Sequence, residues 1–139
     1  MTTPSDPCAD RSKHLEFVQA VVARLSNSSF LVKGWAMTLT GIIAAVATQG
    51  AKPGSALIGP GVTVGFWLLD SSYLRQERQF RILYEQVASQ PPGAIPPFTM
   101  DAARYGGSVR RREVALSTLM LMFYGIMIAI DVLIAVALD

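Results

Sequence analysis

The end of the chain, residues 114–138, reads VALSTLMLMFYGIMIAIDVLIAVAL and carries one charged residue, Asp131. A helix rises ~1.5 Å per residue, so this run would reach ~37 Å as one helix. That length exceeds the ~30 Å hydrocarbon core of a bilayer. Charged residues make up only 16% of the chain, against about 25% in an average soluble protein. The run therefore predicts a transmembrane helix.

Two further apolar runs precede it. Residues 30–48 form the first, and residues 56–70 form a shorter second one that can continue as helix past Asp70. Between them, residues 49–55 hold two glycines and a proline, which is typical of a tight loop. The sequence predicts an all-α membrane protein with three transmembrane helices, N-terminal and middle cytoplasmic helices, and assembly as a homo-oligomer.

The basic residues predict the orientation of these spans. Four lie before or at the start of the first span, one in the loop, seven between the second and third spans, and none after the third. Lysine and arginine concentrate on the cytoplasmic side of membrane proteins. Residues 1–29 and 71–113 are therefore expected in the cytoplasm. The 49–55 loop and the C-terminus are expected on the far side.

The cytoplasmic segments are expected to be partly helical. Residues 1–9 are polar and hold two prolines, which predicts disorder. An amphipathic helix follows over residues 10–25, either on the membrane surface or against another cytoplasmic helix. Residues 26–29, Ser-Asn-Ser-Ser, are expected to break it. The helix of the second span should run to Ser89, with Glu77 and Arg81 as an i,i+4 pair, before the stiff connector PPGAIPPF.

Arginines and aromatic residues gather in the middle segment. One interpretation is an anchor that contacts anionic lipid, because lipid headgroups attract clustered arginines. Another is a site for an anionic nucleotide or oligonucleotide, since arginine and exposed aromatic rings bind phosphates and stacked bases. The candidate ligand-binding residues are Arg75, Arg78, Arg81, Arg104, Arg110, Arg111, Arg112, Tyr73 and Tyr105.

Polar residues inside the spans need partners, because a charge at mid-bilayer costs at least ~2.5 kcal/mol. Lys33 and Asp70 lie at the same predicted depth and are expected to form a structural ion pair. Asp131 has no such partner in the sequence. It lies seven and fourteen residues after Tyr124 and Ser117, so the three predict one polar stripe. The stripe either lines a pore in an oligomer, where Asp131 would form a carboxylate ring, or is structural.

No catalytic signature is present, and we do not expect an enzyme. The chain lacks a P-loop, an H-E-x-x-H, a G-x-S-x-G and a dinucleotide-binding glycine motif. It has one cysteine, Cys8, and one histidine, His14, which is too few for a His/Cys metal site. We expect no cofactor. Gly61 and Gly65 form a G-x-x-x-G, which allows helices to approach closely in an oligomer.

Two stretches carry a resemblance to known proteins. KHLEFVQAVVARLSNSSFLVKGWAMTLTG precedes FWLLDSSYLRQERQFRILYEQV, and a final apolar helix follows. The combination resembles small bacterial membrane proteins, some of them encoded beside phage-defence genes, and the effector channel of Hailong-type anti-phage systems. In those systems a nucleotidyltransferase makes short DNA oligomers that hold a small tetrameric channel closed. The resemblance implies a homo-oligomer, with a tetramer favoured, a single-stranded DNA oligomer as ligand and a co-encoded nucleotidyltransferase as partner.

The expected function is an inner-membrane ion channel or membrane-disrupting effector in anti-phage defence. An anionic nucleotide or oligonucleotide on the cytoplasmic side would gate it. The alternative from another class is a non-conducting anchor or scaffold whose cytoplasmic helices dock a partner protein. A third, weaker alternative is a small transporter.

Overall fold

The structure is a computed structural model that describes residues 7–49, 58–91 and 94–137. Every regular element among these residues is helical, which confirms the all-α fold class. The predicted 49–55 loop lies outside the described residues apart from Gln49. The helices are α1 (Pro7–Ala47), α2 (Ile58–Ser89), α3 (Ala102–Tyr105), α4 (Arg111–Ala115) and α5 (Thr118–Ala137).

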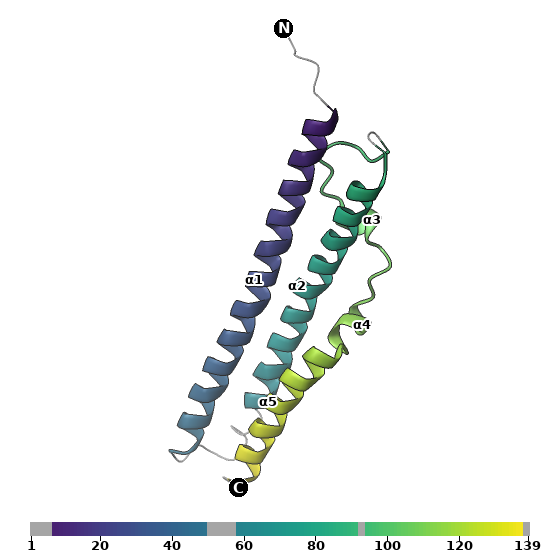
Figure 1. Cartoon of the computed structure of the whole chain (residues 1–139). Helices are drawn as coiled ribbons and strands as arrows, with labels where there is room; N and C mark the ends of the chain where they lie inside the picture. The colour runs from purple at the N-terminus through teal and green to yellow at the C-terminus, as the bar shows by residue number, and fades with distance from the viewer. Residues whose placement is uncertain (1–6, 50–57, 92–93, 138–139) are drawn as a thin grey trace.

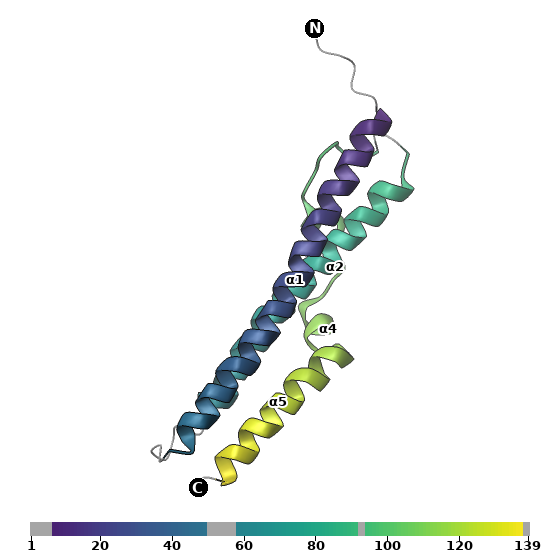
Figure 2. The ribbon, with the colours of Figure 1, turned by 60° about the vertical axis from the view of Figure 1, so that its left-hand side comes forward.

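Two long helices form the frame of the molecule. Helices α1 and α2 run antiparallel and side by side over most of their length (Figures 1 and 2). With 41 residues, α1 is ~60 Å long. Helix α5 packs mainly against α2 at the end nearer the C-terminus, and the short helices α3 and α4 also pack on α2. The result is a narrow rod with three helices at one end.

Each end of the rod has its own core. At the end formed by the start of α1 and the end of α2, Val18, Leu83, Val87 and Ala102 are buried together. The predicted amphipathic helix of residues 10–25 therefore packs on another helix. At the other end, the buried residues are Ala36, Met120, Tyr124 and Met127, with Phe66, Trp67, Leu74 and Phe123 packed around them. We call these the polar half and the apolar half, because their surfaces differ.

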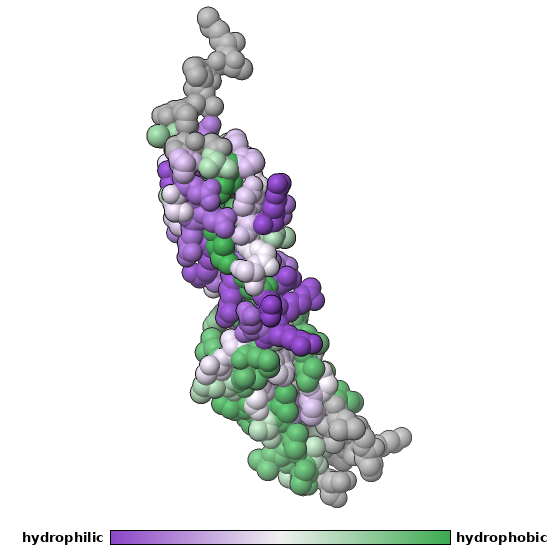
Figure 3. Space-filling view, turned by 90° about the vertical axis from the view of Figure 1, so that its right-hand side faces the viewer, coloured by the Kyte–Doolittle hydropathy of each residue, from purple (hydrophilic) through white to green (hydrophobic). Residues whose placement is uncertain are grey.

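The surface of the apolar half is hydrophobic. Large apolar side chains of α1, α2 and α5 are exposed there, including Phe30, Trp35, Ile42, Leu68, Met122, Leu133 and Val136. Figure 3 shows this half as mostly hydrophobic, with strongly hydrophilic side chains gathered at the junction with the other half. An exposed apolar surface of this extent is typical of contact with lipid or protein.

Two described helices are long and apolar enough to cross a membrane. They are α1, over residues Cys8–Ala47, and α5. In the most apolar 18-residue window of each helix, only 11% and 22% of the residues are buried, respectively. Such exposure differs from that of a soluble core helix and supports association with a membrane. Helix α2 does not qualify, because its apolar part among the described residues, 58–69, is only ~18 Å long.

The N-terminal half of α1 corrects two predictions. The helix begins at Pro7, not Asp10, so the disorder predicted for residues 7–9 is wrong, and residues 1–6 lie outside the described part. Proline is favourable in the first helical turn, where its missing N–H has no partner to lose. The predicted break at residues 26–29 is also wrong. The Ser28 hydroxyl donates to the Arg24 carbonyl one turn back, and the Ser29 hydroxyl donates to Asp70 on α2.

The predicted span over residues 114–138 is not one helix. Helix α4 ends at Ala115 and α5 begins at Thr118, with a bend at Leu116 and Ser117. The Trp67 indole donates to the Ala115 carbonyl at 3.1 Å, so that carbonyl has a partner outside the helix. With 20 residues, α5 is ~30 Å long and still matches a hydrocarbon core.

The segment after α2 returns along that helix towards the apolar half. Helix α2 ends at Ser89, as predicted, and residues 94–101 are not helical. The linker then follows α2 backwards: Gln86 donates to the Tyr105 carbonyl, and Arg75 donates to the Val109 carbonyl. At Gly106 an added Cβ would lie 2.8 Å from the Gln79 Cα, so only glycine fits this close approach.

Candidate functional site

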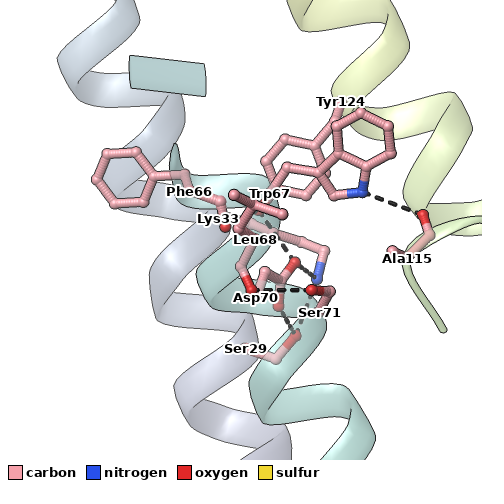
Figure 4. Close-up of polar contacts among 9 residues, drawn as sticks. All are labelled: Ser29, Lys33, Phe66, Trp67, Leu68, Asp70, Ser71, Ala115 and Tyr124. Carbon is pink, nitrogen blue, oxygen red and sulfur yellow. Dashed lines mark hydrogen bonds and ion pairs between the residues drawn. The ribbon is translucent and has the colours of Figure 1, made fainter. Parts of the chain in front are cut away.

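Asp70 is the centre of a buried polar cluster in the apolar half. The Lys33 ammonium lies 2.5 Å from Asp70 Oδ2, so the predicted ion pair is present. The Ser29 hydroxyl donates to Oδ1 at 2.5 Å, and the Tyr124 hydroxyl donates to Oδ2 at 3.0 Å. Lys33 also donates to Ser29 at 2.9 Å. We call Ser29, Lys33, Asp70 and Tyr124 the Asp70 cluster; Figure 4 shows how they converge.

The Asp70 cluster compensates its charges within the chain. The Asp70 carboxylate is fully buried, and a buried charge is tolerated when it is paired and hydrogen-bonded. Here it receives one cation and two hydroxyl donors, which come from α1 and α5. One carboxylate of α2 thereby joins all three helices of the apolar half.

Aromatic contacts hold Tyr124 in place. Its ring is nearly parallel to that of Trp67, 12° apart in plane and 6.2 Å between centroids. Phe123 meets it edge-on at 5.0 Å. Trp67 in turn donates to the Ala115 carbonyl just before α5 begins. The Trp67 side chain therefore fixes both the tyrosine of the cluster and the start of α5 (Figure 4).

Asp131 belongs to a second buried cluster. The Thr63 hydroxyl donates to Asp131 Oδ2 at 2.7 Å, and Thr40 Oγ1 lies 3.3 Å from Thr63 Oγ1. Because the Thr63 hydrogen goes to the carboxylate, Thr40 donates to Thr63. The hydrogen-bond chain therefore runs from α1 through α2 to the carboxylate on α5. We call Thr40, Thr63 and Asp131 the Asp131 cluster; all three are buried.

The two clusters repeat at seven-residue spacing on every helix. Lys33 and Thr40 are seven apart on α1, Thr63 and Asp70 on α2, and Tyr124 and Asp131 on α5. Seven residues are nearly two turns, so both members of each pair face the bundle interior, ~10 Å apart along the axis. Ala36 and Met127 are buried between the two layers. The bundle interior thus alternates polar, apolar and polar layers.

The predicted polar stripe of Ser117, Tyr124 and Asp131 is partly corrected. Tyr124 and Asp131 share a face, but it is turned into the chain's own bundle, where they are 0% and 6% exposed. Ser117 lies at the bend before α5 and is not on the same helix. Asp131 also has a partner that the sequence did not indicate, Thr63. A pore lined by these residues stays a prediction.

Sequence reasoning missed Ser29, Thr40 and Thr63. Each is a small hydroxyl residue in an apolar or mixed run, where hydroxyls commonly bond their own helix backbone, as Thr38 does. A signal for two of them was present: Thr40 and Thr63 stand one heptad from Lys33 and Asp70. Applying the seven-residue step used for Asp131 to the other two spans would have found them.

The candidate ligand-binding residues lie in the polar half and at its junction with the apolar half, and several already have intramolecular partners. Arg75 donates to the Val109 carbonyl at 3.0 Å. Arg81 pairs with Glu77 at 2.7 Å, as the i,i+4 spacing predicted. Tyr105 packs against the core of the polar half, under Arg104, whose Cζ lies 6.0 Å from the ring centroid. Tyr73 is half-buried.

Among the candidate ligand-binding residues, the side chains of four arginines are exposed and make no hydrogen bond, ion pair or cation–π contact with any described residue: Arg78, Arg110, Arg111 and Arg112. The last three lie at the start of α4, next to the apolar half. Arg75 holds the preceding residue, Val109, against α2. The exposed triplet is therefore fixed at the junction of the two halves and can meet a phosphate there.

A shallow groove runs between α1 and α2 in the polar half. Its lining mixes polar, charged and apolar side chains: Gln19, Val22, Ala23, Ser26, Arg81, Tyr84 and Glu85. No group of three or more metal-binding side chains occurs in the part of the chain that the structure describes. Comparison of the chain with protein-family models, curated proteins and solved structures finds no match.

Proposed function

We propose that the protein crosses a bacterial inner membrane three times, with the polar half in the cytoplasm. The exposed apolar surface supports insertion of the apolar half. The apolar part of α2 is short, but it lies against α1 and α5, and its terminal Asp70 is neutralised by Lys33. The arginines on the cytoplasmic side agree with the positive-inside rule.

The proposed assembly is a homo-oligomer, with the tetramer favoured by the resemblance to the Hailong-type effector channel. Gly61 and Gly65 are exposed on α2, and an added Cβ at either would meet nothing within 4 Å. This G-x-x-x-G face is therefore open to another helix at close range. The exposed apolar residues of α5 offer a second contact surface between copies.

Within this assembly, the proposed function is an ion channel or membrane-disrupting effector in anti-phage defence. The observation that carries the proposal is the pair of carboxylates, Asp70 and Asp131, stacked one heptad apart inside the apolar half. Ionisable residues within a membrane usually mark an ion pathway or a proton relay. Both carboxylates are sealed inside the bundle in this structure, so conduction requires α5 to move away from α1 and α2.

The proposed regulator is an anionic nucleotide or a short single-stranded DNA oligomer made by a co-encoded nucleotidyltransferase. It would bind Arg110, Arg111 and Arg112, together with Arg78. Four residues separate Arg112 from Ser117, and α5 begins at the next residue. A ligand that holds the triplet therefore also restrains α5. Anionic lipid headgroups compete for the same arginines.

Flux through liposomes tests the proposal. Purified protein should conduct ions, and a short single-stranded DNA oligomer should reduce the flux. Neutralising the triplet as Arg110→Gln, Arg111→Gln and Arg112→Gln should weaken the oligomer's effect at least about tenfold and flatten its salt dependence. The matched control is Arg81→Gln, since Arg81 already pairs with Glu77. Absence of flux under every ligand condition would reject the channel.

A non-conducting anchor or scaffold is the second candidate. The side chains of Tyr124 and Asp131 point into the chain's own helix bundle, where they bond other helices. This structural role favours the scaffold. The groove between α1 and α2 would dock the partner protein. Native mass measurement separates the two functions: a monomer in mild detergent removes the oligomeric channel, whereas a stable oligomer with flux removes the scaffold.

A further inference from the structure

The two buried carboxylates of the apolar half differ in how their charge is compensated. Asp70 has the Lys33 ammonium at 2.5 Å and accepts hydrogen bonds from Ser29 and Tyr124. Asp131 accepts one hydrogen bond, from the neutral Thr63 hydroxyl, and has no cationic partner among the described residues. Asp70 is thus balanced by its own chain, and Asp131 is not.

No other ionisable group of the described chain faces Asp131. Residues 34–49, in α1 and the turn after it, and residues 58–69 of α2 contain none. On α5 the only other one is Tyr124, a heptad away, where its hydroxyl bonds Asp70. The nearest charges, Lys33 and Asp70, are in that same layer, ~10 Å distant, and neutralise each other. Lys52 and Asp139 lie outside the described residues.

The oxygens around Asp131 form a compact set. Thr40 Oγ1, Thr63 Oγ1 and Asp131 Oδ2 follow one another at 3.3 and 2.7 Å. The other carboxylate oxygen lies against the backbone of α2 at Gly59, where an added Cβ would stand 3.2 Å from it. Glycine therefore makes room for the carboxylate. Carboxylate and hydroxyl oxygens are the ligands that small, hard cations prefer.

We propose that Thr40, Thr63 and Asp131 form an exchangeable binding site for a small monovalent cation that neutralises Asp131. A proton and a sodium ion share this chemistry, and the experiment separates them. A proton would bind a carboxylate oxygen, and a sodium ion would be held by Asp131 and the two hydroxyls. The inference rests on the proposed membrane insertion of the apolar half, but not on conduction.

The test is the melting temperature of the full chain in nanodiscs as NaCl replaces choline chloride at constant ionic strength, at neutral and at acidic pH. A ligand that binds only the folded state raises the melting temperature with its concentration. If sodium binds, about a hundredfold more NaCl should raise it by a few degrees. If a proton binds, the rise should follow acidification and be independent of sodium.

Variants locate the effect. Asp131→Asn, which is neutral and similar in shape, should lose the cation dependence and melt at or above the temperature of the unliganded wild type. Thr38→Val is the control on α1, because Thr38 is an exposed threonine two residues before Thr40 whose hydroxyl bonds its own helix backbone, and it should keep the dependence. A wild type that responds neither to sodium nor to pH beyond the response of Asp131→Asn overturns the site.

Three further outcomes separate the cation site from a lysine counterion and from the channel function. A cation dependence that is absent from the wild type and appears in Lys52→Met would make that lysine the counterion of Asp131 and would overturn the proposal. Cation-dependent melting in a protein without flux would retain the site and reject the channel. Flux without cation-dependent melting would retain the channel and reject the site.

Discussion

At the scale of single residues, Asp70 connects the three helices of the apolar half. It is fully buried, and its two oxygens accept from Ser29 and Lys33 of α1 and from Tyr124 of α5. The cost of desolvating such a carboxylate is offset only when all of these donors are in place. Removing Lys33 leaves a buried carboxylate beside neutral partners, and removing Asp70 leaves a partly buried ammonium without its counterion.

Breaking this ion pair should be costly. We expect Lys33→Met or Asp70→Asn alone to destabilise the protein by about 3–5 kcal/mol, because each leaves an uncompensated charge. The double variant should cost less than the sum of the two, since no charge remains unpaired. Equilibrium unfolding in mixed micelles measures all three.

The control for this cycle is Arg78→Gln, which removes an exposed charge from α2 and should change stability by less than about 0.5 kcal/mol. Strictly additive single-variant effects would mean that Lys33 and Asp70 do not interact in the membrane.

At the scale of elements, the extent of a helix and one ion pair between helices were predictable from the sequence, and the other contacts between helices were not. The extent of α2 followed from a run without glycine or proline between Trp67 and Ser89, and the Lys33–Asp70 pair followed from equal depth in antiparallel spans. At the bend between α4 and α5, the Ala115 carbonyl accepts a hydrogen bond from Trp67, which lies 48 residues earlier in the chain. The serines of residues 26–29 predicted a helix break because the sequence does not show their hydrogen-bond partners. Ser28 bonds the preceding helical turn, and Ser29 bonds α2.

The bend itself can be tested. In Trp67→Phe the Ala115 carbonyl loses its indole donor, while a ring that can stack on Tyr124 is kept. We expect that carbonyl to accept the Leu119 amide instead, so that α4 and α5 join into the longer helix. Hydrogen exchange should then slow at Leu119 by about tenfold. The matched variant Trp35→Phe changes an exposed tryptophan and should leave it unaltered; equal exchange in both would show that Trp67 does not cause the bend.

At the scale of the whole molecule, the two halves of the chain expose different surfaces. The apolar half exposes aliphatic and aromatic side chains on all three of its helices, and the polar half has its own packed core. The exposed triplet of Arg110, Arg111 and Arg112 lies where the halves meet. Helix α1 begins in the polar half, and α5 ends at the far end of the apolar half (Figure 1). We therefore expect the two ends of the chain on opposite sides of the membrane.

Thiol labelling checks this orientation. Cys8 is exposed, so a membrane-impermeant maleimide should label it in inside-out vesicles and not in intact spheroplasts. Ala137→Cys, placed in a Cys8→Ser background, should show the opposite pattern, and detergent should expose both. Labelling of Cys8 from outside intact spheroplasts would contradict the proposed topology.

The seven-residue step between the two polar layers also constrains which insertions and deletions the gene can tolerate. One residue added between Lys33 and Thr40 turns everything beyond it by ~100° and carries Thr40 away from Thr63. The same holds between Thr63 and Asp70, and between Tyr124 and Asp131. We expect insertions and deletions in these three intervals to be tolerated only in steps of about seven residues. The linker after Ser89 is not helical throughout, so this seven-residue periodicity does not apply to it.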